Sequence, residues 1–441
     1  MELKDCDYLV GGLSITPDMQ SFLSLVRAGR NVFLTGKAGT GKSTLLQHLR
    51  DCIIDENHVV LAPTGVAAIN IGGSTIHKFF GFLPDITREF IQSQEYLPKN
   101  QSVMKLLKTV VIDEVSMVRA DLMDCIDLAL RRFGPIQNEP FGGVQMLFVG
   151  DLHQLQPIVT RSEREFIDTN FESPFFYSSP AFNTLEWSFI ELKEVFRQKD
   201  AEFVEILNAT RINRMEERHF QRLAKSVDPT FISQSEEDYI TLVATNNLAQ
   251  RINDRELDAL QSPLHSSKAI VFGPFSKGDF PADIDLRVKV DSKIMMLNND
   301  LWGRWVNGTL AKITGMKQSE NKEVYEISVL LEETGETYMV TRHTWEVTRP
   351  RSENGKLVHD TVGSFTQFPL MLAWAITIHK SQGKSFERVI IDLSAPVFAN
   401  GQLYVALSRC RSLESTILRQ QIDPRQILVD ERVSEFYSKV A

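Results

Sequence analysis

The sequence has 441 residues and a formal net charge of −9; 43% of its residues are hydrophobic and 24% are charged. This length predicts more than one domain, because a single hydrophobic core rarely grows beyond about 250 to 300 residues. No apolar run is long enough to cross a bilayer, which excludes an integral membrane protein built from helices. The acidic balance argues against coating nucleic acid by bulk charge and slightly favours a small-molecule enzyme, although a focused basic groove is compatible with it.

The amino terminus and the cysteines indicate a reducing compartment. The start, MELKDCDYLVGG, lacks a basic segment followed by an apolar core, so we expect no export or organelle signal. The four cysteines form no CxxC pair and have no histidine at ligand spacing. We therefore expect no structural zinc and no membrane association.

The first predicted helix begins close to Thr16 in the segment ITPDMQSFLSLV. Thr16 is a favoured N-cap, Pro17 suits the first helical position, and Gln20 follows on the first turn. An amide at this place is suited to reading the edge of an adenine base. Taken alone, however, Gln20 is better explained as an ordinary surface glutamine.

A phosphate-binding loop follows the next predicted strand. NVFLTGKAGTGKSTLLQHLR contains a strand over residues 31–35, a GxxxxGK[ST] loop over residues 36–43 and then an amphipathic helix. The backbone wraps the phosphates, Lys42 reaches the outer phosphates, and Ser43 offers its hydroxyl to Mg²⁺. The motif therefore predicts ATP and Mg²⁺ as cofactors. The residues expected to bind the nucleotide here are Gly36, Gly39, Thr40, Gly41, Lys42, Ser43 and Thr44.

Two more buried strands are predicted to end in polar residues. TVVIDEVSM places Asp113 and Glu114 after an apolar run, where Asp113 would hold Mg²⁺ and Glu114 would polarise the attacking water. VQMLFVGDLHQLQP repeats the arrangement with Asp151 and Gln154, and Gln154 is a candidate sensor of the terminal phosphate. A solvated strand end is the alternative interpretation of the first segment, and the role of Gln154 is undecided from its own segment alone.

The alternation of strand and helix returns after about residue 188, which predicts a second α/β lobe. SFIELKEVFRQ leads to Arg197, and GQLYVALSRCRS is a predicted helix that bears Arg409. This lobe has no phosphate loop of its own, because the triplet Gly383-Lys384-Ser385 is preceded by Ile378 where the loop needs a glycine. Two lobes with one loop predict ATP in a cleft, with both arginines supplied by the second lobe to stabilise the transferring charge. Plain surface arginines are the alternative at this point.

Short alternating strands between the two parts of the second lobe predict a small β-barrel. Residues 286–317 carry six Lys or Arg against two Asp, a local excess of four positive charges in an acidic chain. Because Trp302 and Trp305 lie in the same stretch, it is a candidate nucleic-acid surface. Core tryptophans beneath a solvated charged face explain the pattern equally well.

The order and wording of the motifs resemble one family. LAPTGVAAINIGGSTIHKFF at 61–80, MVRADLMDCIDLALRRF at 117–133 and ELKEVFRQKD at 191–200 are similar to stretches of the PIF (petite integration frequency) DNA helicases. These belong to the superfamily 1B group that includes RecD-like enzymes, and the resemblance extends from near residue 14 to near residue 415. It implies an α/β fold of two RecA-like P-loop NTPase lobes, with a small wedge insertion in the first and an SH3-like β-barrel insertion in the second.

The resemblance also sets the expected boundaries. We expect the first lobe at residues 1–187 with the wedge insertion at about 66–100, the second lobe at 188–285 and 363–441, and the SH3-like insertion at 286–362. One departure is Ala311, because the related pattern NGxxGxV usually has a second glycine there.

Site residues are carried over from the family motif by motif. The resemblance implies that Gln20 contacts adenine and that Gly383 allows a close backbone approach to the nucleotide. It implies catalytic roles for Lys42, Asp113, Glu114, Gln154, Arg197 and Arg409, and metal binding by Ser43 and Asp113. The residues expected to contact single-stranded DNA are Thr64, His77, His153, Thr245, Asn246, Thr377 and His379, to which the β insertion adds Trp302.

We therefore expect an ATP-dependent DNA helicase that moves 5′ to 3′ on single-stranded DNA and unwinds forked or tailed duplex, with G-quadruplexes and RNA–DNA hybrids as further substrates. The polarity rests on the resemblance alone. We expect work in genome maintenance, including DNA repair, recombination and telomere maintenance, in the bacterial cytoplasm at the nucleoid or in a eukaryotic nucleus. The rival hypothesis is an ATP-gated single-strand clamp or remodelling subunit without unwinding. A small-molecule kinase would leave the second-lobe motifs unexplained.

Overall fold

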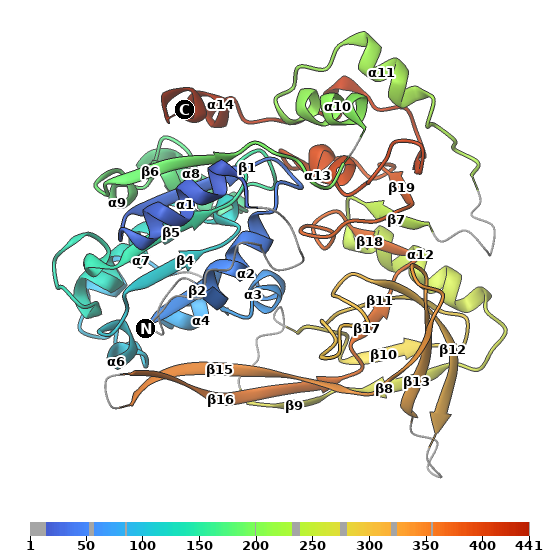
Figure 1. Cartoon of the computed structure of the whole chain (residues 1–441), viewed down its shortest axis with the longest axis horizontal. Helices are drawn as coiled ribbons and strands as arrows, with labels where there is room; N and C mark the ends of the chain where they lie inside the picture. The colour runs from blue at the N-terminus through green and yellow to red at the C-terminus, as the bar shows by residue number, and fades with distance from the viewer. Residues whose placement is uncertain are drawn as a thin grey trace. The chain divides into compact units, whose positions relative to one another are not determined.

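A computed structural model of the chain describes residues 15–440, apart from residues 53–56, 84–85, 199, 232–238, 274–279, 319–323 and 354–355. The chain forms two compact units (Figure 1). The first unit consists of the chain up to Arg197, the segment Thr348–Asp360 and the segment from Asp430 onward, and the second consists of Gln198–Val347 and Thr361–Val429. The chain therefore leaves the first unit after Arg197, contributes one internal segment to it, and returns to it again at Asp430.

The first unit is built on a six-stranded parallel sheet with the strand order β3-β2-β4-β5-β1-β6. Its inner strands are largely apolar, and TVVI of β4 is buried throughout, because helices cover both faces of the sheet. The strands are β1 (Asn31–Gly36), β2 (His58–Ala62), β3 (Ser74–Thr75), β4 (Thr109–Ile112), β5 (Gln145–Val149) and β6 (Trp187–Leu192).

Alternate residues of the inner strands belong to two cores on opposite faces of this sheet. Val111 of β4 belongs to the core that α1 and α2 cover, whereas its neighbours Val110 and Ile112 belong to the core that α7 and α9 cover. Both faces are therefore hydrophobic, which explains why these strands show no polar alternation. The helices of this unit are α1 (Pro17–Arg27), α2 (Lys42–Cys52), α3 (Gly65–Asn70), α4 (Ile76–Phe80), α5 (Arg88–Gln92), α6 (Gln101–Met104), α7 (Ala120–Phe133), α8 (Arg161–Asn170), α9 (Pro180–Asn183) and α14 (Glu431–Val440).

The boundary between the two lobes lies later in the chain than expected. Strand β6 pairs with β1 along its whole length, from Trp187 opposite Asn31 to Leu192 opposite Gly36, and it forms an edge of the first sheet. The first unit then continues to Arg197. The predicted boundary at residue 188 falls within β6, whose pairing with β1 could not be read from the local sequence.

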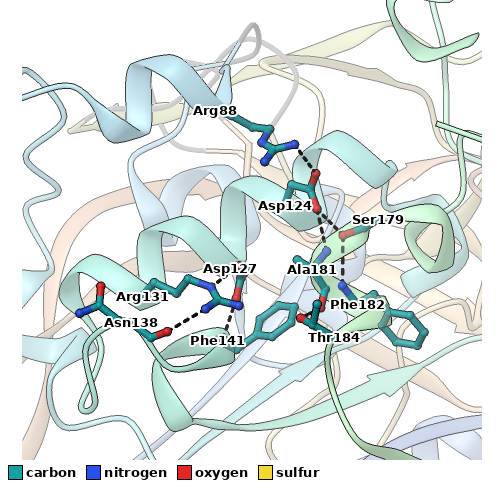
Figure 2. Close-up of polar contacts among 10 residues, drawn as sticks. All are labelled: Arg88, Asp124, Asp127, Arg131, Asn138, Phe141, Ser179, Ala181, Phe182 and Thr184. Atoms are coloured by element: carbon teal, nitrogen blue, oxygen red, sulfur yellow. Dashed lines mark hydrogen bonds and ion pairs between the residues drawn. The ribbon is translucent and has the colours of Figure 1, made fainter. Parts of the chain in front are cut away.

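Helix α7 ties neighbouring segments of the first unit together through buried carboxylates, as Figure 2 shows. Asp124 accepts a hydrogen bond from the Ser179 hydroxyl (2.5 Å) and pairs with Arg88 of α5 (3.2 Å). Asp127, three residues further along the helix, accepts a hydrogen bond from the Phe141 N–H (2.7 Å). Buried carboxylates require such partners, because an unpaired charge in the interior is strongly unfavourable. The acidic residues of this stretch therefore anchor the segments around them, including a helix of the expected wedge insertion.

The second unit contains a smaller parallel sheet with the order β18-β7-β19-β20. Together with the first sheet, it confirms the predicted α/β class. In the described part of the chain, no helix is both long and apolar enough to cross a membrane. The elements are β7 (Ile240–Val243), β18 (Ala375–Thr377), β19 (Val389–Asp392) and β20 (Thr416–Leu418), with α10 (Ala201–Arg211), α11 (Glu217–Ala224), α12 (Asn246–Ala259) and α13 (Gln402–Ser408).

A β-rich region lies in the chain between α12 and β18, and it belongs to the second unit except for the segment Thr348–Asp360 of β15 and β16. Five of its strands form an antiparallel sheet in the order β14-β13-β12-β11-β17, and smaller sheets pair β8 with β10 and place β9 beside β16. The β-rich region runs from β8 to β17, and the predicted limits of residues 286 and 362 fall within it. Its strands are β8 (His265–Lys268), β9 (Ile270–Phe272), β10 (Asp285–Val288), β11 (Lys293–Met296), β12 (Leu310–Gln318), β13 (Val324–Leu331), β14 (Thr337–Val340), β15 (His343–Glu353), β16 (Lys356–Gln367) and β17 (Leu370–Leu372).

Candidate nucleotide and DNA sites

The phosphate loop joins the end of β1 to the start of α2, and its geometry requires two glycines. Gly41 has a φ of +83°, which favours glycine, and a Cβ there would lie 3.2 Å from the ε-methyl group of Met19. A Cβ on Gly36 would lie 2.6 Å from the Thr40 hydroxyl and 2.9 Å from the Leu192 carbonyl oxygen. The loop is thus enclosed by α1 and by the end of β6, with its backbone curled tightly enough to hold an anion.

Lys42 lies inside the curl of this loop. Its ammonium group donates hydrogen bonds to the carbonyl oxygens of Gly36 (2.6 Å) and Lys37 (3.0 Å), and the Thr40 hydroxyl donates to Lys37 as well (2.9 Å). Residues 43–44 follow on the first turn of α2, where the Ser43 side chain is exposed. A cation inside the loop and an accessible hydroxyl beside it fit a nucleotide phosphate and its Mg²⁺ ion.

Asp113 and Glu114 follow β4, which is separated from β1 by a single strand. Asp113 is buried and accepts a hydrogen bond from the Glu114 N–H (2.9 Å). Burial raises the pKa of Asp113 to about 6, while this hydrogen bond and the charge of Lys42 act in the opposite direction. Glu114 has a φ of +49°, a strained conformation for a residue with a side chain and a common one at functional sites. A buried carboxylate in the field of Lys42 is suited to holding a cation.

The loop after β5 packs against the turn that follows Glu114. A Cβ on Gly150 would lie 3.1 Å from the backbone nitrogen of Val115, so only glycine allows this approach. Asp151 is buried and accepts hydrogen bonds from the His153 N–H (3.2 Å) and the Gln154 side-chain amide (3.4 Å). Gln154 is therefore held by Asp151 on the loop that packs against the turn after Glu114, and its role as phosphate sensor stays a prediction.

Arg197 is the last residue of the first stretch of the first unit, whereas the motifs assign it to the second lobe. The Phe196 N–H donates a hydrogen bond to the carbonyl oxygen of Gly39 (2.9 Å), and a Cβ on Gly41 would lie 3.8 Å from the Phe196 ring. Because β6 pairs with β1, the chain that leaves β6 passes over the phosphate loop. Arg197 follows directly, so Arg197 lies in the first unit and Arg409 in the second, whereas the motifs suggested that both come from the second lobe.

The first turn of α1 carries Gln20 beside the phosphate loop. The Met19 N–H donates to the Thr16 hydroxyl (3.3 Å), which caps the helix as expected, and Met19 is fully buried against the loop. Gln20 itself is exposed. Its place is consistent with a contact to a nucleotide base, and the assignment stays a prediction.

Arg409 is buried within the second unit, with 1% of its surface exposed. Its guanidinium donates hydrogen bonds to the carbonyl oxygens of Val405 (3.0 Å), Lys384 (3.2 Å) and Ser381 (3.4 Å). It therefore organises the loop over residues 378–385. In this structure the guanidinium of Arg409 binds the backbone of that loop. The motifs predicted only a catalytic role for this arginine.

Lys384, the lysine of the second glycine-lysine-serine triplet, contacts the β-rich region. Its side chain is buried, its ammonium donates to the side-chain oxygen of Asn307, and a Cβ on Gly308 would lie 3.4 Å from its stem. Burial lowers the pKa of Lys384 to about 8. Gly383 has a φ of +78° and lies in a turn with no helix after it. The triplet therefore forms a connection between two parts of the second unit.

In the first unit, the candidate DNA contacts follow neighbouring strands of the sheet. Thr64 comes after β2 and accepts a hydrogen bond from the Ala67 N–H (3.2 Å), and His77 lies on α4 after β3. His153 comes after β5 and stacks on Tyr437 of α14, with ring centroids 5.3 Å apart and planes at 16°. Because parallel strands end at the same edge, the three side chains share the edge that carries the phosphate loop. The contact with α14 could not be foreseen, since it joins residues far apart in the chain.

In the second unit, the candidate DNA contacts also lie at strand ends. Thr245 caps α12 by accepting a hydrogen bond from the Leu248 N–H (3.4 Å), so Asn246 begins that helix. Thr377 ends β18, and His379 lies two residues later. Burial lowers the pKa of His379, which favours the neutral imidazole.

The two tryptophans of the β-rich region have different environments. Trp302 is 77% exposed, whereas Trp305 is 5% exposed and part of the core. The Arg304 guanidinium lies over both rings, 4.8 Å from the Trp302 centroid and 4.6 Å from the Trp305 centroid, and pairs with Asp300 (2.6 Å). Ala311 is buried in β12, where a small side chain fits the core. Trp302 thus stays a candidate for stacking, and Trp305 is a core residue.

Comparison with known proteins identifies relatives along nearly the whole chain. The PIF1-like helicase family matches residues 20–227. The ATP-dependent DNA helicase PIF1 of Mus musculus is 33% identical over 435 residues, which cover 96% of this chain and 62% of the mouse protein. The ATP-dependent DNA helicase Pif1 of Bdellovibrio bacteriovorus is 30% identical over 438 residues, which cover 97% of this chain and 92% of that protein. The chain thus spans less than two thirds of the mouse protein and most of the bacterial one.

The solved structures of Pif1 from Bacteroides sp are similar to this one in fold. The complex with ADP-AlF4 matches with a TM-score of 0.86 at 34% identity, covering 97% of both chains. The same Bacteroides protein bound to ssDNA matches with a TM-score of 0.71, at the same identity and coverage. These matches support the two-lobed α/β architecture.

Proposed function

Because the chain belongs to the PIF1-like helicase family, we propose that it is an ATP-dependent DNA helicase. One observation carries the proposal: the phosphate loop, Asp113, Glu114 and Gln154 follow three adjacent strands of one sheet. Ligands of parallel α/β sheets bind at the carboxyl ends of the strands. Polar residues also follow the strands of the second sheet, where they are candidate DNA contacts. A protein that only hydrolysed nucleotide would not need DNA contacts.

The residues of the first unit have distinct chemical tasks in this proposal. Lys42 neutralises the outer phosphates, Glu114 orients and polarises the attacking water, and Gln154 responds to the terminal phosphate. Mg²⁺, held by the Ser43 hydroxyl and by Asp113, would spread the charge of the phosphates when bound. The raised pKa of Asp113 falls again when a cation neutralises its charge, because an opposite charge favours the ionised form.

Two arginines are proposed to stabilise the charge that develops during phosphoryl transfer. Arg197 follows the residue that bonds the phosphate loop, so it needs little movement. Arg409 is held by the carbonyl oxygens of Ser381 and Lys384, so its participation requires that this loop release it. We therefore propose that nucleotide turnover is linked to a rearrangement of residues 381–384, next to the candidate DNA contacts Thr377 and His379.

The DNA would follow the polar strand ends of both units. Threonine hydroxyls and the amino terminus of α12 are suited to phosphate groups, since backbone N–H groups point outward there. The Bacteroides relative solved with ssDNA supports single-stranded DNA as the ligand. The direction 5′ to 3′, and forked or tailed duplex as the substrate, complete the proposal.

Unwinding assays on matched substrates test this function. The full chain is mixed with ATP, Mg²⁺ and a duplex that carries either a 5′ or a 3′ single-stranded tail, and strand separation is followed by fluorescence. We expect separation of the 5′-tailed duplex, little of the 3′-tailed one, and ATP hydrolysis that single-stranded DNA stimulates. A preference for the 3′ tail would overturn the polarity.

The clamp hypothesis predicts a different outcome of the same assay. A clamp binds single-stranded DNA in an ATP-dependent way but separates neither duplex at any ATP concentration. Hydrolysis that DNA does not stimulate would contradict both hypotheses. The variant Lys42→Ala serves as the control, because it lacks the cation inside the phosphate loop while the loop glycines remain.

A further inference from the structure

Three parallel strands of the second sheet end level with one another. In the pairing register, Thr377 of β18 and Asp392 of β19 both lie opposite Val243 of β7. The segments that leave β18 and β7 contain candidate DNA contacts, namely residues 377–379 and 245–246. The loop that leaves β19, residues 393–401, has been given no function so far, although it begins at the same edge.

Phe398 in this loop is an exposed aromatic residue that stacks on a candidate DNA contact. Its side chain is 62% exposed, and its ring lies 6.1 Å from the ring of His379 with the planes at 15°. A lone exposed phenylalanine is common and needs no explanation. A phenylalanine that is layered on an imidazole at the edge where DNA is proposed to run has the geometry of a stacking platform.

The loop holds Phe398 in place through a buried glutamine. The side-chain oxygen of Gln402 accepts a hydrogen bond from the Phe398 N–H (3.1 Å), and its amide donates to the carbonyl oxygen of Ala244 (3.3 Å). Gln402 is fully buried. Since Ala244 immediately precedes Thr245, one side chain fixes the position of Phe398 relative to the amino terminus of α12. The backbone of Phe398 is held by Gln402 and its ring stacks on His379, so the side chain loses less freedom when a base packs on it.

We propose that Phe398 stacks on a base of single-stranded DNA, as a base-contacting residue beside the phosphate contacts at Thr245 and Thr377. The inference rests on the proposed function and adds to it the chemistry that holds a base. Stacking tolerates every sequence, because each base presents a flat π-face. The hydroxyls and N–H groups nearby hold phosphates, while Phe398 and His379 form the apolar layer. A protein partner that packs on Phe398 is the alternative that the experiment separates.

The test combines a protein variant with a change in the DNA. Affinity is measured by fluorescence anisotropy for Phe398→Ala and wild type, with labelled oligo(dT) and with an oligonucleotide of the same length that contains abasic sites. We expect Phe398→Ala to weaken oligo(dT) binding by about 5- to 150-fold, the range typical of one lost stack. The variant and the wild type should bind the abasic strand with more similar affinity, since the base that Phe398 contacts is then absent.

Further variants separate stacking from loss of structure. Phe398→Tyr should bind oligo(dT) with an affinity close to that of the wild type. Phe398→Leu, which keeps apolar volume without a π-face, should bind it more weakly. The salt dependence of binding should be unchanged in all three variants, because no phosphate contact is removed. The matched control is Phe166→Ala, which removes an exposed phenylalanine that also contacts an aromatic neighbour, Phe171, and should leave DNA affinity unaltered.

The possible outcomes distinguish this inference from the proposed function. Equal weakening by Phe398→Ala on intact and abasic strands would overturn the stacking role, and so would wild-type affinity of Phe398→Ala in a protein that unwinds DNA. Unchanged DNA affinity would leave a protein contact as the explanation of the exposed ring. If the wild-type chain binds no single-stranded DNA, the proposed function and this inference both fall.

Discussion

The chain contains the triplet glycine-lysine-serine twice, and the two copies have different structures. At Gly41–Ser43 the triplet starts helix α2, and Lys42 lies over the carbonyl oxygens of a curled loop. At Gly383–Ser385 no helix follows, and Lys384 is buried with its ammonium against Asn307. Both glycines have positive φ values, +83° and +78°. Three identical letters therefore do not define a phosphate site.

The difference teaches that the surroundings decide what the triplet does. The first copy has a glycine five positions upstream and a buried strand before it, so that N–H groups converge and a helix amino terminus follows. The second copy lies in a turn whose carbonyl oxygens accept hydrogen bonds from Arg409. One lysine is placed to meet phosphate, and the other connects the turn to the β-rich region.

The largest contrast is expected between the two lysines. Lys42→Ala should lower ATP hydrolysis by at least about 10²- to 10³-fold and abolish unwinding, because a cation facing the developing charge is lost. Lys384→Ala should keep ATP hydrolysis within about threefold of wild type, since this lysine does not face the phosphate loop's ligand in the proposal. Steady-state hydrolysis with saturating single-stranded DNA measures both. Hydrolysis by Lys42→Ala at the wild-type rate would refute the phosphate-loop assignment.

Arg409→Ala tests whether this arginine, which stabilises the turn of the second triplet, also takes part in catalysis. Removing it leaves several buried carbonyl oxygens without this donor, so the free energy of unfolding should fall by about 2 to 4 kcal/mol. If Arg409 also acts on the transition state, turnover drops at least about tenfold while nucleotide affinity stays nearly unchanged. Thermal unfolding, nucleotide titration and turnover are compared at a temperature where the variant is folded. Loss of affinity with unchanged turnover would exclude the catalytic role.

Gly41 and Gly383 hold the same position in the two triplets, so replacing each by alanine compares the space around them. Alanine at either position is strained by about 1 to 2 kcal/mol, because both residues have left-handed φ values. At Gly41 the new Cβ also meets Met19 at 3.2 Å, whereas at Gly383 nothing lies within 4 Å. Gly41→Ala should therefore reduce ATP binding strongly, and Gly383→Ala should mainly lower the melting temperature. Equal loss of nucleotide affinity in both variants would instead support Gly383 as the nucleotide contact that the resemblance implies.

The smallest expected effect concerns the pH dependence of Lys384. Burial lowers the pKa of this amine to about 8 in the folded chain, while an unfolded lysine titrates near its ordinary value of about 10.4. Between these values the unfolded state binds more protons, so this group makes the folded state more stable as pH rises and imposes its full penalty below pH 8. Lys384→Met should therefore be more stable than wild type by about 1 to 3 kcal/mol at pH 7. Denaturant unfolding at pH 7 and pH 10 should show this advantage shrinking at the higher pH; an advantage that does not change would contradict the buried amine.

Much of the candidate site could be predicted because its motifs are local. The strand, loop and helix around Lys42, and the carboxylates after β4, depend on residues within a few positions of one another. The roles of Arg197 and Arg409 could not be predicted as well, since they depend on distant partners. The membership of Arg197 in the first unit follows from the pairing of β6 with β1, and the burial of Arg409 follows from carbonyl groups about 25 residues away.

By itself, the sequence determined the α/β class, the phosphate loop, the carboxylate pair and the polar residues at strand ends, because hydrophobic periodicity and short motifs act over a few residues. Only the tertiary structure decided which side chains support them. It packed Tyr437 from the end of the chain against His153, turned Lys384 onto Asn307, and layered Phe398 on His379. Contacts of this kind join residues that are separated in the chain, and they form only when the packing of whole elements brings those residues together.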